Sequence, residues 1–116
     1  MSVLSKRVRK QARELVGIAY TRELNYHLDK LSQKFDDWRK NTVDCWELND
    51  LIHKFHDGTS RDLYKTYNYT KDEVFLIARA LVRGFLQSDE VPKELLELSQ
   101  VIASHLKINE NDEDRV

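Results

Sequence analysis

The sequence predicts an all-α protein, a single-domain helical bundle of four main helices plus one short helix, with a long N-terminal helix. Apolar residues recur with helical periodicity over most of the 116 residues. Only three Gly and one Pro are present, and the many turns of a β-protein depend on these residues. We expect the bundle domain to cover residues 1–108 and the acidic residues 109–116 to form a disordered tail.

The first helix is predicted from about Ser5 to Arg39, a segment without proline. Its apolar residues share one face as far as Ala19 and continue from Tyr20 on a face rotated by roughly a third of a turn. Either one long helix meets different neighbours along its length, or the helix bends within residues 17–21. We favour one long helix, with or without a kink at this point.

The second helix is predicted within NTVDCWELNDLIHKFHDG, residues 41–58. Asp44 and Glu47 have the spacing of a capping box at its start. Gly58 stands where a residue in the left-handed conformation ends many helices. A short helix within TSRDLYKTYN, residues 59–68, is then expected, capped by Thr59 or Ser60.

Two further helices complete the predicted bundle. YTKDEVFLIARALVRGFLQ, residues 69–87, begins with a capping box from Thr70 to Glu73 and is apolar around most of its circumference. It is therefore expected to be the most buried helix, with Leu76 on its narrow exposed strip. The last helix is predicted within DEVPKELLELSQVIASHLKI, residues 89–108, with Pro92 at a favoured first-turn position.

Charge is distributed unevenly along a chain whose formal net charge is only −1. Residues 1–40 carry ten Lys and Arg against five Asp and Glu, whereas residues 89–116 carry three against eight. The favoured interpretation of these basic residues is a solvated face, and the alternatives are an anion-binding surface and pairing with the acidic C-terminal region of the same or a neighbouring chain. Nucleic acid is not the favoured partner, because no helix-turn-helix sequence or Gly-rich phosphate loop accompanies them. The anion-binding candidates are Lys6, Arg7, Arg9, Lys10 and Arg13.

The stretch HKFHDGTSRD, residues 53–62, contains an adjacent His-Asp pair. This pair, with an earlier His and a later Asp, resembles the signature of HD-type metal-dependent phosphohydrolases, which are all-α. The resemblance implies a metal site formed by His27, His56, Asp57 and Asp89. Helix phase places His56 beside the apolar stripe of its helix, and His53 and Asp57 away from it, so we favour a helix end without metal. The metal candidates within this stretch are His53, His56 and Asp57.

The sequence RELNYH, residues 22–27, has a second spacing with a chemical meaning. Arg followed by His five positions later is similar to the motif of HEPN-family ribonucleases, which are small helical bundles that dimerise. The resemblance implies that Arg22 orients a phosphate and that His27 acts as an acid or base near neutral pH. The simpler interpretation is an exposed Arg and a His at the edge of the core.

An aromatic residue favours association. Trp46 projects away from the apolar stripe of the second helix, and large aromatic side chains are favoured at interfaces. Alternatively, the long first helix covers Trp46 within one chain. The shifting stripe of the first helix also offers apolar surface in two directions. The interface candidates are Trp46, Leu15, Ala12, Tyr64 and Tyr67.

We therefore predict a protein that acts by protein–protein association, as a homodimer or with another protein in a regulatory or adaptor role, without a cofactor. RNA cleavage through Arg22 and His27 and phosphate hydrolysis through His56 and Asp57 are the catalytic alternatives. No run approaches the ~20 apolar residues of a membrane span. The single Cys45 and the lack of an apolar segment after the basic start favour a cytoplasmic location.

Overall fold

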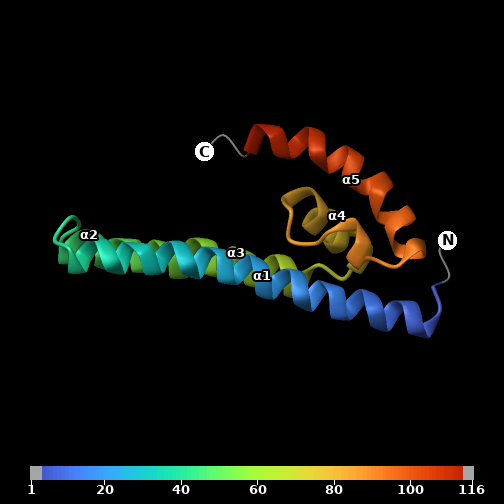
Figure 1. The fold of residues 1–116 in the computed structure, drawn as a ribbon, viewed down its shortest axis with the longest axis horizontal. Helices are drawn as coiled ribbons and strands as arrows, with labels where there is room; N and C mark the ends of the chain where they lie inside the picture. Colours follow the sequence, from blue (N-terminus) through green and yellow to red (C-terminus); the bar gives the residue numbers. More distant parts are fainter. Residues whose placement is uncertain (1–3, 114–116) are drawn as a thin grey trace. The chain divides into compact units, whose positions relative to one another are not determined.

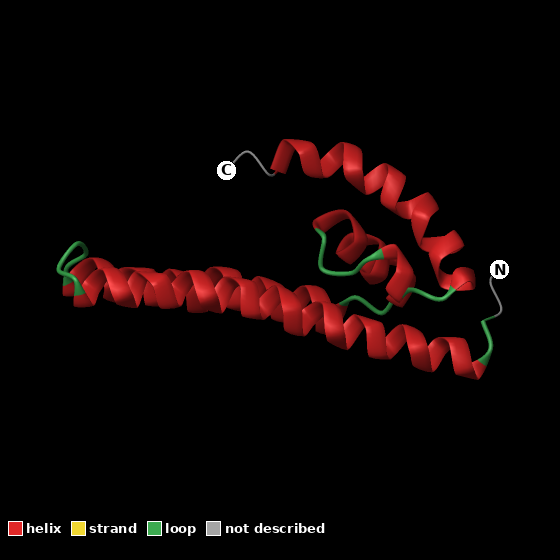
Figure 2. Ribbon diagram, viewed as in Figure 1, coloured by secondary structure: helices red, strands yellow, loops and turns green. Residues whose placement is uncertain are grey.

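The computed structural model describes residues 4–113, and the side chains of residues 4–106. The predicted all-α class is confirmed, because this part of the chain contains helices and no strand (Figures 1 and 2). Residues 114–116 of the predicted tail lie outside the described residues, whereas the helix α5 extends as far as Glu113. The elements are α1 (Lys6–Arg39), α2 (Cys45–Lys54), the π-helix η1 (Phe55–Ser60), α3 (Arg61–Tyr69), α4 (Glu73–Arg83), the 3₁₀ turn η2 (Ser88–Glu90) and α5 (Lys93–Glu113).

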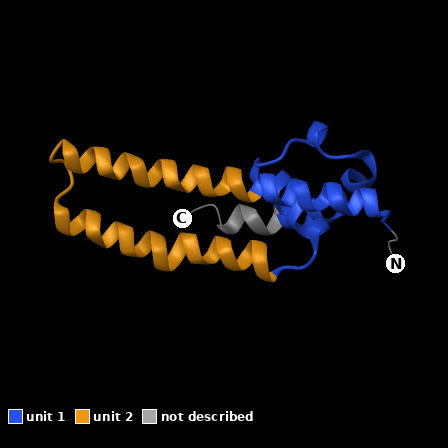
Figure 3. Ribbon diagram, turned by 90° about the horizontal axis from the view of Figure 1, so that it is seen from below, with its two compact units in different colours: residues 1–19, 70–116 blue, residues 20–69 orange. Residues whose placement is uncertain are grey.

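The chain divides into two compact units, a division that the sequence did not predict (Figure 3). One unit comprises Met1–Ala19 and Thr70–Val116, and the other comprises Tyr20–Tyr69. The long helix α1 contributes to both, and the division falls where its apolar stripe rotates. Different parts of α1 therefore belong to different cores, as the rotation of the stripe predicted.

The first unit has a well-buried core centred on α4. The helix begins at the N-cap Asp72, whose side chain accepts a hydrogen bond from the Phe75 amide. It ends at Gly84, whose φ of 83° places it in the left-handed region that favours glycine. The core residues from α1, α4 and the C-terminal segment are Ala12, Leu15, Ala19, Leu76, Ile77, Ala78, Ala80, Leu86, Val91, Leu95 and Ser99.

The second unit is a helical hairpin. The C-terminal half of α1 runs antiparallel to the continuous helical segment formed by α2, η1 and α3 (Figure 3). The turn between them contains Asn41, which has a φ of 63°. Asp44 then caps α2 by accepting a hydrogen bond from the Glu47 amide at 2.8 Å, as the sequence predicted.

The π-helix keeps two apolar stripes facing α1. From Phe55 to Leu63 an uninterrupted α-helix would turn about 80° beyond two full turns, at about 100° per residue. A π turn accommodates one more residue than an α turn. The extra residue returns Leu63 and Tyr67 to the side on which Leu48 lies, and all three side chains are buried.

Four local predictions were wrong. Thr59 and Ser60 do not cap a separate helix, because both lie inside η1, which continues directly into α3. Gly58 does not end a helix: it lies within η1 and has no left-handed φ, because the π turn continues the chain into α3. Thr70 is not the cap of α4, because Asp72 stands one residue before the helix and accepts the capping bond. Leu76, predicted on an exposed strip, is buried because α4 is covered on that side also.

Candidate functional site

The hairpin is held together by a small polar and aromatic cluster. The rings of Tyr20 and Tyr67 stack with their centroids 4.6 Å apart. The Tyr67 hydroxyl donates a hydrogen bond to the Glu23 carboxylate at 2.7 Å, and this carboxylate is buried. Burial of a carboxylate requires hydrogen-bond donors. The cluster therefore joins α1 to α3 and explains why Tyr67 is in the core.

Three of the predicted interface residues are not available to a partner. Ala12 and Leu15 are 2% and 8% exposed, and both lie in the core of the first unit. Tyr67 is buried against Tyr20. The expectation that these residues form free surface was wrong, because folding within one chain already covers them.

The other predicted interface residues are exposed. Trp46 is 80% exposed, so α1 does not cover it within the described part of the chain. Tyr64 is also exposed and makes an edge-to-face contact with Tyr69. Trp46 and Tyr64 are 18 residues apart, or about 27 Å along a helix. They do not form one aromatic patch.

A groove with basic walls runs along one side of the hairpin. Its lining residues include three lysines and no Asp or Glu, and its cavity volume is about 260 Å³. Leu31, Leu51 and Phe55 provide half-buried apolar surface in it. We call this feature the lysine groove, lined by His27, Lys30, Leu31, Lys34, Leu51, Lys54, Phe55 and Thr59.

On the opposite side of the hairpin, the stretch of α1 from Thr21 to Phe35 and the facing side of α2 carry no charged side chain, whereas Arg39 lies at the end of this side. At about 100° per residue, Lys30 and Lys34 lie on one side of Leu31 in α1, whereas Leu28 and Phe35 lie on the other. In α2, Lys54 likewise lies on one side of Leu51, whereas Ile52, Asn49 and Cys45 lie on the other. Leu28 is 43% exposed on this side. We call this surface the neutral face, comprising Thr21, Leu24, Asn25, Leu28, Ser32, Phe35, Cys45, Asn49 and Ile52.

The His-Asp pair lies in the π-helix. His53, His56 and Asp57 are all exposed. His53 and Asp57 line a surface depression together with Asp50, whose carboxylate pairs with the Lys54 ammonium at 2.8 Å. The Asp50 carboxylate raises the pKa of Lys54, chiefly through the hydrogen bond between them. Among the side chains that the structure describes, those of residues 4–106, no group of three or more His, Cys, Asp or Glu is placed to hold a metal ion.

Arg22 and His27 lie on the same uninterrupted helix, α1. Five positions correspond to about 140° around the axis, so the two side chains leave the helix in different directions. His27 lines the lysine groove, whereas Arg22 is exposed elsewhere. Within the hairpin the two groups do not converge on a common reacting atom, as general acid–base chemistry requires.

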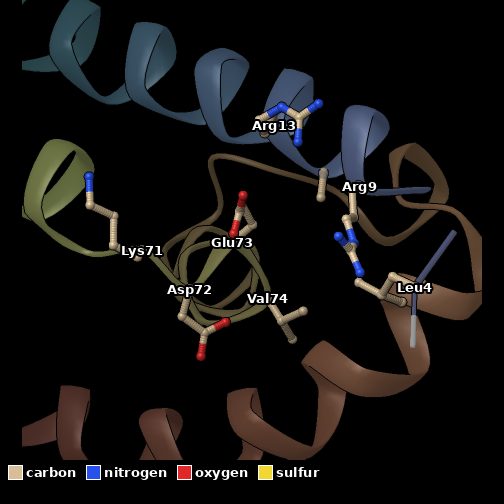
Figure 4. Close-up of a pocket in the computed structure, with 8 residues that line it drawn as sticks. Leu4, Arg9, Arg13, Lys71, Asp72, Glu73 and Val74 are labelled. Atoms are coloured by element: carbon tan, nitrogen blue, oxygen red, sulfur yellow. The ribbon is translucent and has the colours of Figure 1, made fainter. Parts of the chain in front are cut away.

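A larger pocket in the first unit brings together part of the basic cluster (Figure 4). Its volume is about 770 Å³, and Arg9 and Arg13 of α1 line it together with Lys71. Asp72 and Glu73 also line it, and Glu73 points toward α1 in the figure. Lys6, Arg7 and Lys10 are exposed outside it. Because Asp72 and Glu73 line the pocket itself, an anion bound there would lie beside two carboxylates as well as the three cations, so the pocket does not favour the predicted anion site.

Sequence reasoning missed both the lysine groove and the neutral face. The sequence feature that could have indicated them is the uneven placement of charge around the second half of α1, where Lys30 and Lys34 lie on one flank only. Which flank of α1 lies beside which flank of α2 can be seen only in the tertiary structure, where Lys30 and Lys34 of α1 and Lys54 of α2 line the same groove.

Comparisons of the chain with protein-family models, with curated proteins and with solved structures give no match. Among the described residues, no helix is both long and apolar enough to cross a membrane.

Proposed function

We propose that this protein acts by protein–protein association, and that the hairpin Tyr20–Tyr69 forms a two-fold dimer through its neutral face. The observation that supports the proposal is the thin core of the hairpin. Among its described residues, the buried aliphatic side chains are Leu48 and Leu63 alone, and each keeps a few per cent of its surface exposed. A helix must bury its apolar stripe against another element, and two helices alone cover only the seam between them. The apolar side chains left half-buried include Leu24, Leu31, Phe35, Leu51, Ile52 and Phe55.

The charge pattern favours a second copy as the occupant of the neutral face. A two-fold interface brings the same surface of each copy together, so charged residues near its centre meet like charges. The neutral face has no charged residue. The lysine groove would instead place Lys30, Lys34 and Lys54 against the same three residues of the copy. Two neutral faces in contact would form a four-helix bundle.

The size of the neutral face predicts the strength of the dimer. It extends about 21 Å from Thr21 to Phe35 and is two helices, or about 20 Å, wide. This projected footprint of about 400 Å² is at the low end for a stable interface, which buries about 800 Å² of accessible surface per partner. We therefore expect a dimer that dissociates at micromolar concentration.

The test is sedimentation equilibrium from about 1 to 200 μM, since an interface of this size predicts dissociation within that range. The wild-type chain should change from its 13.8 kDa monomer to a dimer over this range. Leu28→Glu would bury two unpaired carboxylates at the interface, which costs several kcal/mol, so its dissociation constant should rise at least tenfold. Val101→Glu makes the same change at an exposed aliphatic residue outside the hairpin and should leave the dissociation constant within about twofold.

A wild-type monomer at every concentration would show that the proposal is wrong. Trp46→Ser tests the other exposed surface of the hairpin. If this variant dissociates the dimer while Leu28→Glu does not, the interface includes the outer side of α2 rather than the neutral face. Circular dichroism of each variant separates loss of association from loss of folding.

We propose a cytoplasmic location for this association, and the state of Cys45 supports it. Its thiol is exposed and unpaired, and such thiols persist in reducing compartments.

A further inference from the structure

We infer that the lysine groove is the docking site for an acidic amphipathic helix of another protein. The groove lies on the opposite side of the hairpin from the neutral face, so this partner is additional to the proposed second copy. The inference rests on the shape, the apolar floor and the charge of the groove.

The lining of the groove is apolar in the middle and basic on both walls. Leu31 of α1 and Leu51 of α2 are half-buried and form the floor together with Phe55. Lys30 and Lys34 stand on the α1 wall, and Lys54 stands on the α2 wall. An apolar stripe on the partner would complete the burial of the floor, and carboxylates on both sides of this stripe would meet the lysines.

Each lysine is held by a neighbour outside the groove lining. The Lys30 ammonium lies over the Tyr26 ring, 4.5 Å from its centroid. Lys54 pairs with Asp50 at 2.8 Å, and Lys34 pairs with Asp37 at 3.8 Å. These contacts keep the side chains near the walls. Exposed ion pairs of this kind contribute little to stability, so a carboxylate of the partner can share these lysines.

The dimensions of the groove favour a helix of limited length. Its α1 wall runs from His27 to Lys34 and its α2 wall runs from Leu51 to Thr59. At 1.5 Å per residue these walls are about 10–12 Å long, which corresponds to two turns of helix. A third helix packed on two others is also the usual way to cover such a seam. The partner therefore needs apolar residues at i, i+3 or i+4, and i+7, with Glu or Asp on both flanks.

The acidic end of this chain does not meet that requirement. Residues 109–116, NENDEDRV, supply carboxylates but contain no apolar residue before Val116. The groove also lacks the features that favour nucleic acid, because its three strong cations are lysines and its floor is largely aliphatic. An acidic helix of a different protein fits both the charge and the floor.

The probe for the test is a fluorescein-labelled peptide of 16 residues, with leucines at the spacing above and glutamates on both flanks. Its binding to the full chain is measured by fluorescence anisotropy at about 0.1 M salt. A scrambled peptide of the same composition, labelled in the same way, is the control. The wild-type chain should bind the designed peptide at least tenfold more tightly than the scrambled peptide, because only the designed peptide presents a continuous stripe.

The matched protein variants carry equal changes of charge. The triple variant Lys30→Glu, Lys34→Glu, Lys54→Glu should bind the designed peptide at least tenfold more weakly than wild type. The control, Lys6→Glu, Lys10→Glu, Lys65→Glu, should stay within about twofold, since these three lysines are exposed outside the groove. Leu28→Glu should also bind the peptide as wild type does. This result would show that peptide binding to the groove does not depend on the proposed dimer. The dimer is tested separately, by sedimentation.

Three results would overturn the inference. Equal binding of the designed and scrambled peptides would show that charge alone attracts the probe. Equal losses in the two triple variants would show that the groove is not the site. Tighter binding of a single-stranded RNA of about 12 nucleotides than of the peptide, lost in the groove variant, would assign the groove to nucleic acid.

Discussion

The three glycines of this chain provide a direct test of the backbone conformations in the structure. Gly17 lies inside α1, Gly58 lies inside the π-helix, and Gly84 follows α4 with a φ of 83°. A methyl group at any of the three positions would meet no heavy atom within 4 Å beyond the local backbone. Substitution by Ala therefore changes backbone preference and leaves packing unchanged at each site.

The expected effects differ in sign. In a helical conformation, Ala restricts the unfolded chain more than Gly does, so Gly17→Ala should stabilise the protein by about 0.5–1 kcal/mol. Gly58→Ala should also be stabilising, by up to about 1 kcal/mol, because φ at this position is not left-handed. Gly84→Ala must adopt the left-handed region, which costs about 1–2 kcal/mol, so a net loss of about 1 kcal/mol is expected.

Urea denaturation provides the measurement, with two signals recorded together. Circular dichroism at 222 nm reports helices in both units, whereas Trp38 and Trp46 both lie in the hairpin, so tryptophan fluorescence reports that unit. If the units unfold together, both signals shift to the same extent in every variant. If they unfold separately, Gly58→Ala shifts the fluorescence transition alone, and the other two variants shift the remaining transition.

Gly58→Ala is the decisive variant. The sequence alone suggests that Gly58 ends a helix in the left-handed conformation, which predicts a loss of about 1 kcal/mol on substitution. A loss of this size would contradict the continuous π-helix described above. A stabilising effect at Gly84 would equally contradict the left-handed cap of α4.

Two further predictions concern single hydrogen bonds. Asp72→Ala should destabilise the protein by about 1 kcal/mol, measured by thermal denaturation, because it removes the side-chain cap of α4; Thr70→Ala should cost clearly less, and equal losses would contradict the assignment of the cap. Tyr67→Phe should cost about 1–3 kcal/mol in urea denaturation followed by tryptophan fluorescence, because the buried Glu23 carboxylate loses its 2.7 Å hydrogen bond. Tyr64→Phe, at an exposed hydroxyl, is the control and should have almost no effect, so similar losses in both variants would contradict the buried bond.

Much of the local structure follows from the sequence alone. Helical periodicity, scarce glycine and the capping spacing of Asp44 and Glu47 predict an all-α fold with a long first helix, and the structure confirms them. The rotation of the apolar stripe near Tyr20 also indicates that α1 meets two sets of neighbours. These features depend on residues close to one another in the chain, so their energies can be inferred from spacing.

The tertiary structure decided which surfaces are free. Sequence patterns could not tell that Leu15 and Tyr67 are covered while Trp46 remains 80% exposed, because burial depends on residues distant in the chain. They also placed a helix end at Gly58, since glycine is compatible with both a left-handed cap and a π turn. The choice between these conformations depends on the need to turn Leu63 toward α1, where its side chain is buried. Local propensity determined that the chain is helical, whereas long-range packing determined the rotation of each helix and hence the surfaces left for partners.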